Sequence, residues 1–263
     1  MQIPFHKYHG TGNDFILIDN RQQQYLDRSS VDSIRHLCNR RFGIGADGLM
    51  LLQSLEGYDF EMVYFNADGR ESSMCGNGGR CITAFAQQLG ILQDQQAHFL
   101  AIDGPHAATL QPNGWVELKM IDVASVEMGQ DYYLLDTGSP HYVVFVEDLD
   151  DINIVENGQA IRYSKRFREE GVNVNFVELK GNGIEVATYE RGVEGETYSC
   201  GTGVCAAAIA YQLYRKDTSI HTVDIQTKGG PLRVRFDAQA DGSYQNLWLC
   251  GPATKVFEGQ CQL

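Results

Sequence analysis

Short segments in which every second residue is apolar recur along the chain, which is the pattern of strands with one buried face. Residues 60–64 (FEMVY) and 184–188 (IEVAT) show it clearly. Further segments of this kind run over residues 14–18, 115–120, 141–146, 174–179, 221–227 and 232–236. Most of them are bounded by Gly, Asn or Asp, which favour turns. The pattern therefore predicts many short strands joined by tight connections.

Two other segments carry apolar residues around most of a helix circumference. Residues 79–89 (GRCITAFAQQL) and 204–214 (VCAAAIAYQLY) are rich in Ala, Leu, Ile and Cys. The first is followed by Gly90, a residue type that commonly ends helices. Because a helix that is apolar nearly all round is buried, we expect each of these helices to lie inside a folded unit.

A motif that occurs once in each half of the chain indicates an internal repeat. The segment FNADG at 65–69 leads into CGNG at 75–78, and YERG at 189–192 leads into CGTG at 200–203. In each copy an alternating segment precedes the motif and an apolar helix follows it. A chain of 263 residues has room for two domains of ordinary size. We therefore expect an α+β fold of two similar domains, each with short strands around one buried helix, joined near Asp122.

Charge and composition narrow the range of partners. The chain has 34 acidic and 21 basic residues and a net charge of −13, which repels nucleic-acid phosphates and anionic lipid headgroups. No stretch approaches the roughly 20 apolar residues of a membrane span, and the first residues do not resemble a secretion signal. The sequence therefore predicts a cytoplasmic protein that acts on a small molecule, with neither nucleic acid nor membrane as a partner.

The seven cysteines fit a reduced compartment, because their number is odd, no CxxC pair occurs and the chain is too large to need disulfides. A lone cysteine beside an apolar helix is usually a small buried hydrophobe. We interpret five of them in this way: Cys38, Cys81, Cys205, Cys250 and Cys261. The spacings from Cys75 to Cys81 and from Cys200 to Cys205 are too wide for the usual pairs of zinc ligands, so we expect no metal.

Cys75 and Cys200 differ from the other cysteines because each lies where a Gly-rich turn enters an apolar helix. The N-terminus of a helix has unpaired N–H groups and about half a positive charge, so it stabilises a thiolate and binds a carboxylate. The glycines let the backbone approach a ligand closely. Matched contexts in both halves favour a shared function over simple packing.

Two such cysteines suit the exchange of a proton on one carbon atom. If pseudo-symmetry brings the two helix N-termini face to face, one cysteine removes a proton and the other delivers one to the opposite face, which inverts the stereocentre. The backbone amides of residues 76–78 and 201–203 would stabilise the enolate-like charge that develops on the substrate.

With these residues in view, the chain resembles the diaminopimelate epimerase family over nearly its whole length. The order and spacing of the matching segments are highly specific. These segments are HGTGNDF near the start, FGIGADGL (42–49), FNADG (65–69), MCGNGGRC (74–81), GSPH (138–141), NVNFV (173–177), YERGVEGET (189–197), SCGTGVCAAA (199–208) and GPATKVFEG near the end.

The resemblance implies a fold and an activity. Two pseudo-symmetric domains, 1–122 and 123–251, would each be a mostly antiparallel β barrel wrapped round a central helix, with strand 252–263 returning to the first. The activity implied is the interconversion of LL-2,6-diaminopimelate and meso-diaminopimelate by two-base proton transfer, in lysine and peptidoglycan precursor biosynthesis. The resemblance also implies no pyridoxal phosphate, no metal and a homodimer.

The family's functional residues can be carried over position by position. The catalytic pair falls on Cys75 and Cys200, and His141 and Ser139 fall where orienting residues would lie. The substrate-binding set falls on Asn13, Asn66, Gly76, Asn77, Asn173, Glu190, Arg191, Gly201 and Thr202. Arg191 and Glu190 supply a donor set for a carboxylate and an acceptor for an ammonium group, although an adjacent Glu-Arg pair is also typical of a solvated strand end.

Two positions depart from the commonest family pattern, and two other functions stay open. Gly48 stands where many members have Gln, and Ser139 where many have Asn. One alternative is a cofactor-independent racemase or epimerase for another amino acid, of the histidine or hydroxyproline type. The set of asparagines with Glu190 and Arg191 favours a long substrate with a second zwitterion. The other alternative is a silent carboxylate-binding protein, which would have no need of thiols at both turns.

Overall fold

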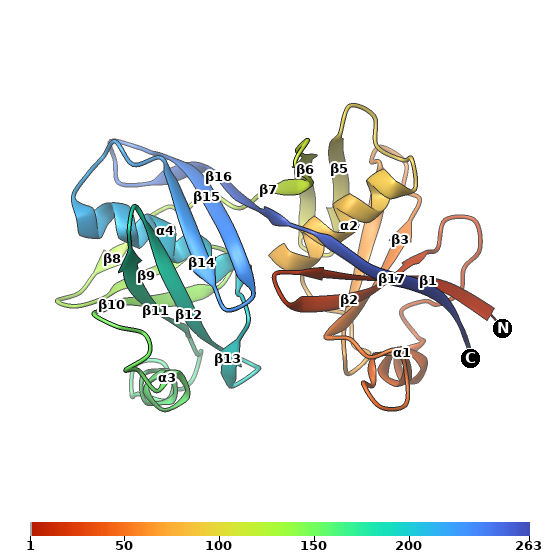
Figure 1. Ribbon diagram of the computed structural model, residues 1–263, viewed down its shortest axis with the longest axis horizontal. Coiled ribbons are helices and arrows are strands. Elements are labelled where there is room, and N and C mark those ends of the chain that lie inside the picture. The colour runs from red at the N-terminus through yellow and green to blue at the C-terminus, as the bar shows by residue number, and fades with distance from the viewer. Residues whose placement is uncertain (1) are drawn as a thin grey trace. The chain divides into compact units, whose positions relative to one another are not determined.

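The computed structural model describes residues 2–263, and these have the expected α+β architecture of four helices and seventeen strands. The chain divides into two compact units (Figure 1). One unit comprises Met1–Leu118 with Pro252–Leu263, and the other comprises Lys119–Gly251. Each unit contains one long, buried helix with strands packed around it.

In the first unit the strands pair in the order β17-β1-β2-β3-β4-β5-β6-β7. The β2–β3 and β4–β5 pairs are parallel and the others are antiparallel. The bounds are β1 Gln2–Gly10, β2 Asn13–Asp19, β3 Gly48–Gln53, β4 Phe60–Asn66, β5 Gln96–Ala101, β6 Gly104–Leu110, β7 Trp115–Lys119 and β17 Thr254–Gln262. A short helix, α1 (Val31–Cys38), packs against β3.

The central helix of this unit is α2 (Gly76–Gln88), which contacts β1, β2, β3 and β6. Phe85 on this helix is fully buried, and burial of a phenylalanine stabilises a fold by about 2–3 kcal/mol. A Cβ at Gly79 would lie 2.9 Å from Leu118 Cδ2, so the glycine lets the helix approach its surroundings closely. The helix ends just before Gly90, whose φ of +68° explains the glycine there.

In the second unit the strands pair in the order β8-β9-β10-β11-β12-β14-β15-β16, and β13 pairs with β12. The β10–β11 and β12–β14 pairs are parallel and the others are antiparallel. The bounds are β8 Glu127–Met128, β9 Tyr133–Asp136, β10 Pro140–Val146, β11 Asn173–Lys180, β12 Gly183–Glu190, β13 Gly195–Thr197, β14 Thr222–Thr227, β15 Gly230–Ala238 and β16 Tyr244–Pro252.

The central helix of the second unit is α4 (Gly201–Arg215), which contacts β9, β10, β11, β12, β14 and β15. A further helix, α3 (Ile154–Arg162), packs on β11 and β12, and the side chain of Asn153 caps it by accepting a hydrogen bond from Glu156 N. Both central helices begin three residues earlier than the apolar pattern predicts. Glycine is a poor helix former, but packing outweighs that preference here.

Candidate active site

Cys75 is the N-cap residue of α2. Its backbone is extended, with φ −97° and ψ 131°, and its carbonyl accepts the first helical hydrogen bond, from Gly79 N at 2.7 Å. The side chain is half-buried. The thiol therefore lies at the end of a helix where the first backbone N–H groups have no partner within the helix.

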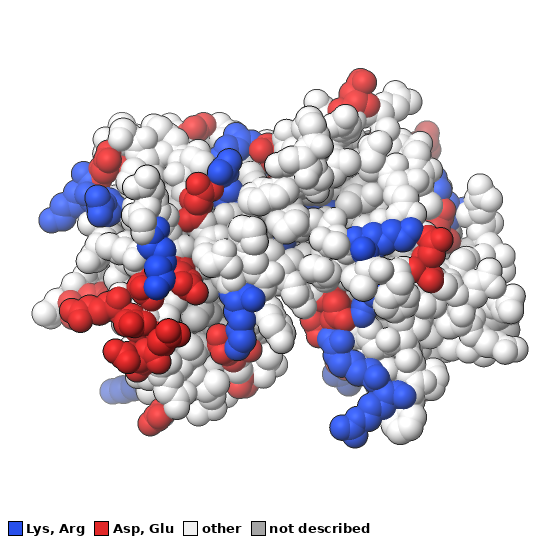
Figure 2. Space-filling view, viewed as in Figure 1, with Lys and Arg blue, Asp and Glu red and all other residues white. Residues whose placement is uncertain are grey.

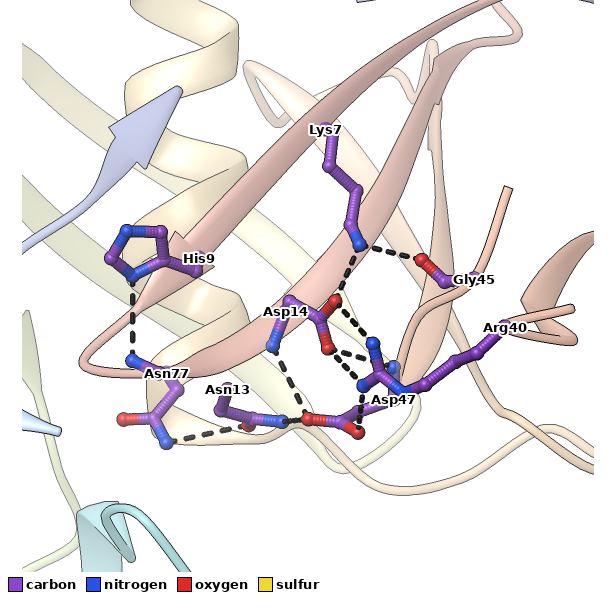
Figure 3. Close-up of polar contacts among 9 residues, drawn as sticks. Lys7, His9, Asn13, Asp14, Arg40, Gly45, Asp47 and Asn77 are labelled. Atoms are coloured by element: carbon purple, nitrogen blue, oxygen red, sulfur yellow. Dashed lines mark hydrogen bonds and ion pairs between the residues drawn. The ribbon is translucent and has the colours of Figure 1, made fainter. Parts of the chain in front are cut away.

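Asn13, the first residue of β2, connects Cys75 to the body of the first unit. Its Oδ1 accepts hydrogen bonds from Cys75 Sγ at 3.5 Å and, as Figure 3 shows, from Asn77 Nδ2 at 3.3 Å. Its Nδ2 donates to Asp47 Oδ2 at 2.8 Å. Asn13 and Asn77, both expected in the site, are thus brought together with Cys75.

A compact network of charged side chains lies next to Asn13 (Figure 3). Arg40 Nη2 is 2.7 Å from Asp47 Oδ1 and 2.6 Å from Asp14 Oδ1, and Lys7 Nζ pairs with Asp14 and donates to Gly45 O. Burial alone would raise the pKa of Asp14, but hydrogen bonds from Arg40 and Lys7 outweigh it and hold that pKa well below its usual range. The carboxyl group of Asp14 is therefore ionised, and hydrogen bonds hold both carboxyl groups of the network in place.

Arg80 ties the first turn of α2 to the surrounding backbone, and its side chain is fully buried. Its guanidinium donates to Asn77 Oδ1 at 3.1 Å and Thr11 Oγ1 at 3.3 Å, and also to Gly76 O at 3.4 Å. Sequence reasoning missed Arg80 and Asp47. A signal for Arg80 was present, since a lone charge in an apolar helix must find partners when it is buried.

Cys200 is the N-cap residue of α4 and is in the same kind of place in the second unit. Its backbone is extended, with φ −112° and ψ 113°, and its side chain is buried. Sγ lies 3.5 Å from Thr202 Oγ1, and that hydroxyl is 2.8 Å from His141 Nε2. His141 is on β10, which packs against α4. The contacts from His141 through Thr202 to Cys200 therefore join this strand to the start of the helix.

His141 is neutral and has a defined tautomer. Burial, together with the positive charge of Arg191, lowers its pKa to about 3. Asn175 Nδ2 approaches His141 Nδ1 at 3.0 Å and donates to Tyr142 O at 3.2 Å. Because a backbone carbonyl only accepts, the amide nitrogen of Asn175 must face this side, and the proton of His141 is therefore on Nε2. Sequence reasoning missed Asn175, although it lies in the NVNFV segment.

Three further predicted residues meet at the start of β11. Asn173 Nδ2 donates to Ser139 Oγ at 2.9 Å, and Asn173 Oδ1 accepts from Arg191 N at 2.8 Å. The Arg191 guanidinium donates to Ser139 Oγ at 3.3 Å and to Glu170 O at 2.9 Å. Ser139 thus links Asn173 with Arg191. Glu190, the last residue of β12, directly precedes Arg191 in the sequence, and its side chain is half-buried.

Asn66 and Gly48 face each other across the β3–β4 pair, and Asn66 is exposed at the end of β4. A Cβ at position 48 would lie 2.5 Å from Tyr64 Cε2 and 2.6 Å from Phe65 O. The ring of Tyr64, which packs edge-on against Phe15, therefore takes the room that a side chain at position 48 would need. The glycine at this position is a steric requirement of this chain.

Gly48→Ala is accordingly expected to lower the free energy of unfolding by about 2–3 kcal/mol, because a backbone atom blocks the new methyl group. Urea denaturation measures the loss. Gly195→Ala is the matched control, since Gly195 also lies in a strand and a Cβ there would have nothing within 4 Å. Equal stability of the two variants would contradict the steric explanation.

Among residues 2–263, no three His, Cys, Asp or Glu side chains are grouped so as to hold a metal ion. The seven cysteines in this part of the chain are free. In the same residues, no helix is both long and apolar enough to cross a membrane. On the face shown in Figure 2, acidic and basic side chains are present on both units.

Comparison with known proteins gives a consistent result. The sequence model of the family described as diaminopimelate epimerase matches residues 5–127 and 133–256. The diaminopimelate epimerase of Flavobacterium psychrophilum is 47% identical over 257 residues, which cover 97% of this chain and 99% of that protein. The diaminopimelate epimerase of Chlorobaculum tepidum is 39% identical, with coverage of 97% and 99%.

Solved structures with much lower sequence identity share the fold. A phenazine biosynthesis protein of the PhzF family from Bacillus anthracis has a TM-score of 0.79 at 14% identity and covers 100% of both chains. A hydroxyproline epimerase from Agrobacterium vitis, with bound trans-4-hydroxy-L-proline, has a TM-score of 0.68 at 15% identity and covers 100% of this chain and 93% of its own.

Proposed function

Because the chain belongs to the diaminopimelate epimerase family, we propose that it interconverts LL-2,6-diaminopimelate and meso-diaminopimelate, with Cys75 and Cys200 as the two proton carriers. The observation that carries the assignment of the carriers is that each cysteine is the N-cap residue of a buried helix. Each also contacts a polar side chain of the predicted site, Asn13 for one and Thr202 for the other. The protein is thus an isomerase of lysine biosynthesis.

The proposed reaction consists of two proton transfers on opposite faces of one carbon atom. The thiolate of one cysteine takes the proton from the α carbon, and the electron pair of the broken C–H bond moves towards the substrate carboxylate. The thiol of the other cysteine then gives its proton to the opposite face of that carbon. The configuration is inverted, and the two sulfur atoms have exchanged protonation states. Neither transfer requires a cofactor.

The backbone at the two helix N-termini supplies the electrostatic stabilisation. The N–H groups of Gly76 and Asn77, and those of Gly201 and Thr202, are in the first turns of α2 and α4. They carry partial positive charge and cost no reorganisation when negative charge develops on the carboxylate. We propose that they hold the carboxylate at the reacting end of the substrate.

The other end of the substrate is a second amino-acid group, and we propose that Asn66, Asn173, Glu190 and Arg191 bind it. The planar guanidinium of Arg191 suits a carboxylate, and the carboxylate of Glu190 suits an ammonium group. Ser139 holds both Asn173 and Arg191 in place through its hydroxyl. Its role is therefore to orient these two residues, as the role of neutral His141 is to orient Thr202.

We also propose that the protein works in the cytoplasm as a homodimer on a small-molecule substrate, with neither nucleic acid nor membrane as a partner. The free cysteines of residues 2–263 support a reducing compartment, and the net charge of −13 opposes binding to anionic polymers and lipids. Size-exclusion chromatography with light scattering tests the dimer.

The reduced protein is expected to convert LL-diaminopimelate to the meso form and to leave lysine essentially unchanged. Lysine has no distal carboxylate, so its binding would leave the charge of Arg191 without a carboxylate partner. Chiral chromatography follows both reactions. In heavy water the product should carry deuterium at the inverted carbon, because the delivering thiol exchanges its proton with solvent, whereas substrate recovered early should carry much less.

A different outcome would identify another function. If the protein converts histidine or 4-hydroxyproline and leaves diaminopimelate untouched, the two-thiol chemistry stands but the substrate assignment is wrong. If no amino acid is converted, yet diaminopimelate protects both cysteines from alkylation, the protein is a binding protein without catalysis.

A further inference from the structure

The hydrogen-bonding partners of the two cysteines differ: the group beside Cys75 accepts a hydrogen bond, and the group beside Cys200 can donate one. We propose that Asp47, by fixing the side-chain amide of Asn13, keeps Cys75 protonated in the ligand-free enzyme, so that Cys200 is the resting thiolate. This inference rests on the proposed function of the two cysteines. It makes Asp47 a positioning residue that acts on Cys75 through Asn13.

The orientation of the Asn13 amide follows from its contact with Asp47. Asp47 forms an ion pair with Arg40, and the oxygens of a carboxylate only accept hydrogen bonds. Asn13 must therefore turn its Nδ2 towards Asp47, at 2.8 Å, and its Oδ1 towards Cys75. Reversing the amide would place oxygen against oxygen.

The consequence for Cys75 is that its contact with Asn13 is with an atom that can only accept a hydrogen bond. An amide oxygen 3.5 Å from Sγ is favourable while the sulfur carries a proton to donate. A thiolate in the same place would face the lone pairs of Oδ1 without a hydrogen between them. Hydrogen bonding to the neutral form of an acid disfavours its ionisation, so this contact favours the thiol.

The charges near Cys75 do not produce the asymmetry by themselves. The network of Lys7, Asp14, Arg40 and Asp47 contains two cations and two anions, which largely cancel at a distance. Further titratable side chains around the N-terminus of α2 are His9 on β1, Arg80 on α2 and Cys81 on the same helix. The positive charge of Arg80 favours a thiolate and so opposes the effect of Asn13.

Cys200 has a partner of the opposite kind. His141 carries its proton on Nε2 and donates it to Thr202 Oγ1, so the hydroxyl proton of Thr202 is directed to another acceptor. Cys200 Sγ lies 3.5 Å from that oxygen and can accept the proton as a thiolate. The nearby titratable groups are His141 on β10, which is neutral, Glu190 on β12 and Arg191, which follows it.

The ligand-free enzyme would therefore hold one proton in a defined place, on Cys75. The substrate stereoisomer that presents its α hydrogen to Cys200 finds the resting enzyme ready to react. The other stereoisomer requires the reversed arrangement, which each turnover leaves behind. Return to the resting arrangement takes place by proton exchange with solvent.

The test is a pH titration of the ultraviolet absorbance of the thiolate in two variants, Cys75→Ser and Cys200→Ser. Each variant keeps only one of the two cysteines of the site. We expect the thiolate of Cys200, read in Cys75→Ser, to form at least about one pH unit below that of Cys75, read in Cys200→Ser; one unit is a tenfold change in the thiol to thiolate ratio. Burial raises the pKa of Cys38 and of Cys81 to about 12, so these two thiols do not obscure the signal near neutral pH.

The role of Asp47 is tested by Asp47→Asn in the Cys200→Ser background. An asparagine at 47 can donate, so this contact no longer fixes the Asn13 amide, although the 3.3 Å hydrogen bond from Asn77 Nδ2 still favours the original orientation. In the fraction of molecules in which the amide reverses, its N–H points to the sulfur, and thiolate formation at Cys75 should move to lower pH by up to about one unit. Asp14→Asn is the matched control, because it also removes a carboxylate that pairs with Arg40, whereas the hydrogen bond from Asn13 Nδ2 goes to Asp47. Asp32→Asn, at an exposed Arg35 pair on α1, controls for any loss of surface charge.

Two results would overturn the proposal. Thiolate formation at Cys75 at the same pH as at Cys200, or lower, would remove the asymmetry, and this comparison does not depend on folding of the Asp47 variant. An equal shift in Asp47→Asn and Asp14→Asn would show that charge acts and orientation of the amide does not. Neither titration requires turnover, so a failure here is distinct from a failure of the unaltered protein to epimerise diaminopimelate.

Discussion

Cys75→Ala and Cys200→Ala are each expected to lower kcat/KM for LL-diaminopimelate at least about a thousandfold while the protein stays folded. Each variant retains one proton carrier, and a single carrier cannot take a proton from one face and supply one to the other. Alanine leaves the helix N-terminus and its N–H groups unchanged, so binding of the substrate carboxylate is less affected than kcat. Steady-state kinetics in both directions, with circular dichroism as a check of folding, measures the effect.

Cys81→Ala and Cys205→Ala are the matched controls, since these cysteines lie inside the same two helices and are fully buried. They should cost about 1 kcal/mol of stability through lost packing and leave turnover nearly normal. Near-normal turnover in Cys75→Ala or Cys200→Ala would exclude the two-thiol reaction.

Gly203→Ala is expected to have the second largest effect, a loss of activity of about a hundredfold or more. A Cβ at position 203 would overlap Asn175 Oδ1 and lie 3.3 Å from both Cys200 Cβ and His141 Cε1. Asn175 cannot move away easily, because Thr188 Oγ1 and Tyr142 O also hold it. Displacing Asn175 would disturb His141 and, through Thr202, the sulfur of Cys200, where a small misplacement is costly for catalysis.

The pseudo-symmetry of the chain supplies the control for this prediction. Gly78 stands in the same place after Cys75 as Gly203 after Cys200, but a Cβ there would meet the flexible ends of Met50 and Met62, 3.3 Å from Met50 Sδ and 3.5 Å from Met62 Cε. Methionine adapts to such changes. Gly78→Ala should therefore retain most of its activity, and equal losses in both variants would show that the rigid Asn175 contact is not the cause.

Strands with a clear inside and outside were predictable from the sequence. The segments 141–146 and 232–236 lie in β10 and β15, where buried and less buried residues alternate. The segments 14–18 and 174–179 lie in β2 and β11, which are buried on both faces over most of their length. Strand β17 was not found by alternation, because most of its residues are exposed and few apolar positions mark a buried face. Helix α1 was missed because its eight residues span only about two turns.

The candidate site was predictable where its residues stand in motifs, and less so where they act through other residues. Cys75 and Cys200 were placed at helix N-termini by their Gly-rich contexts, and this position is observed. Asp47 and Asn175 were missed because their importance depends on contacts with residues far away in the sequence, Asn13 for one and His141 for the other. Nothing in local pattern or spacing reports such pairs.

The pairing of β17 with β1 separates the order of synthesis from the order of folding. Gln262 pairs with Gln2 and Thr254 with His9, so β1 is made before the second unit and its partner β17 after it. Lys119–Gly251 forms the second unit from one continuous segment, which leaves the ribosome before β17 does. Until β17 is made, the edge of β1 that will receive it is open to pairing with other chains. Protection of a growing chain against aggregation at this edge therefore depends on the timing of β17.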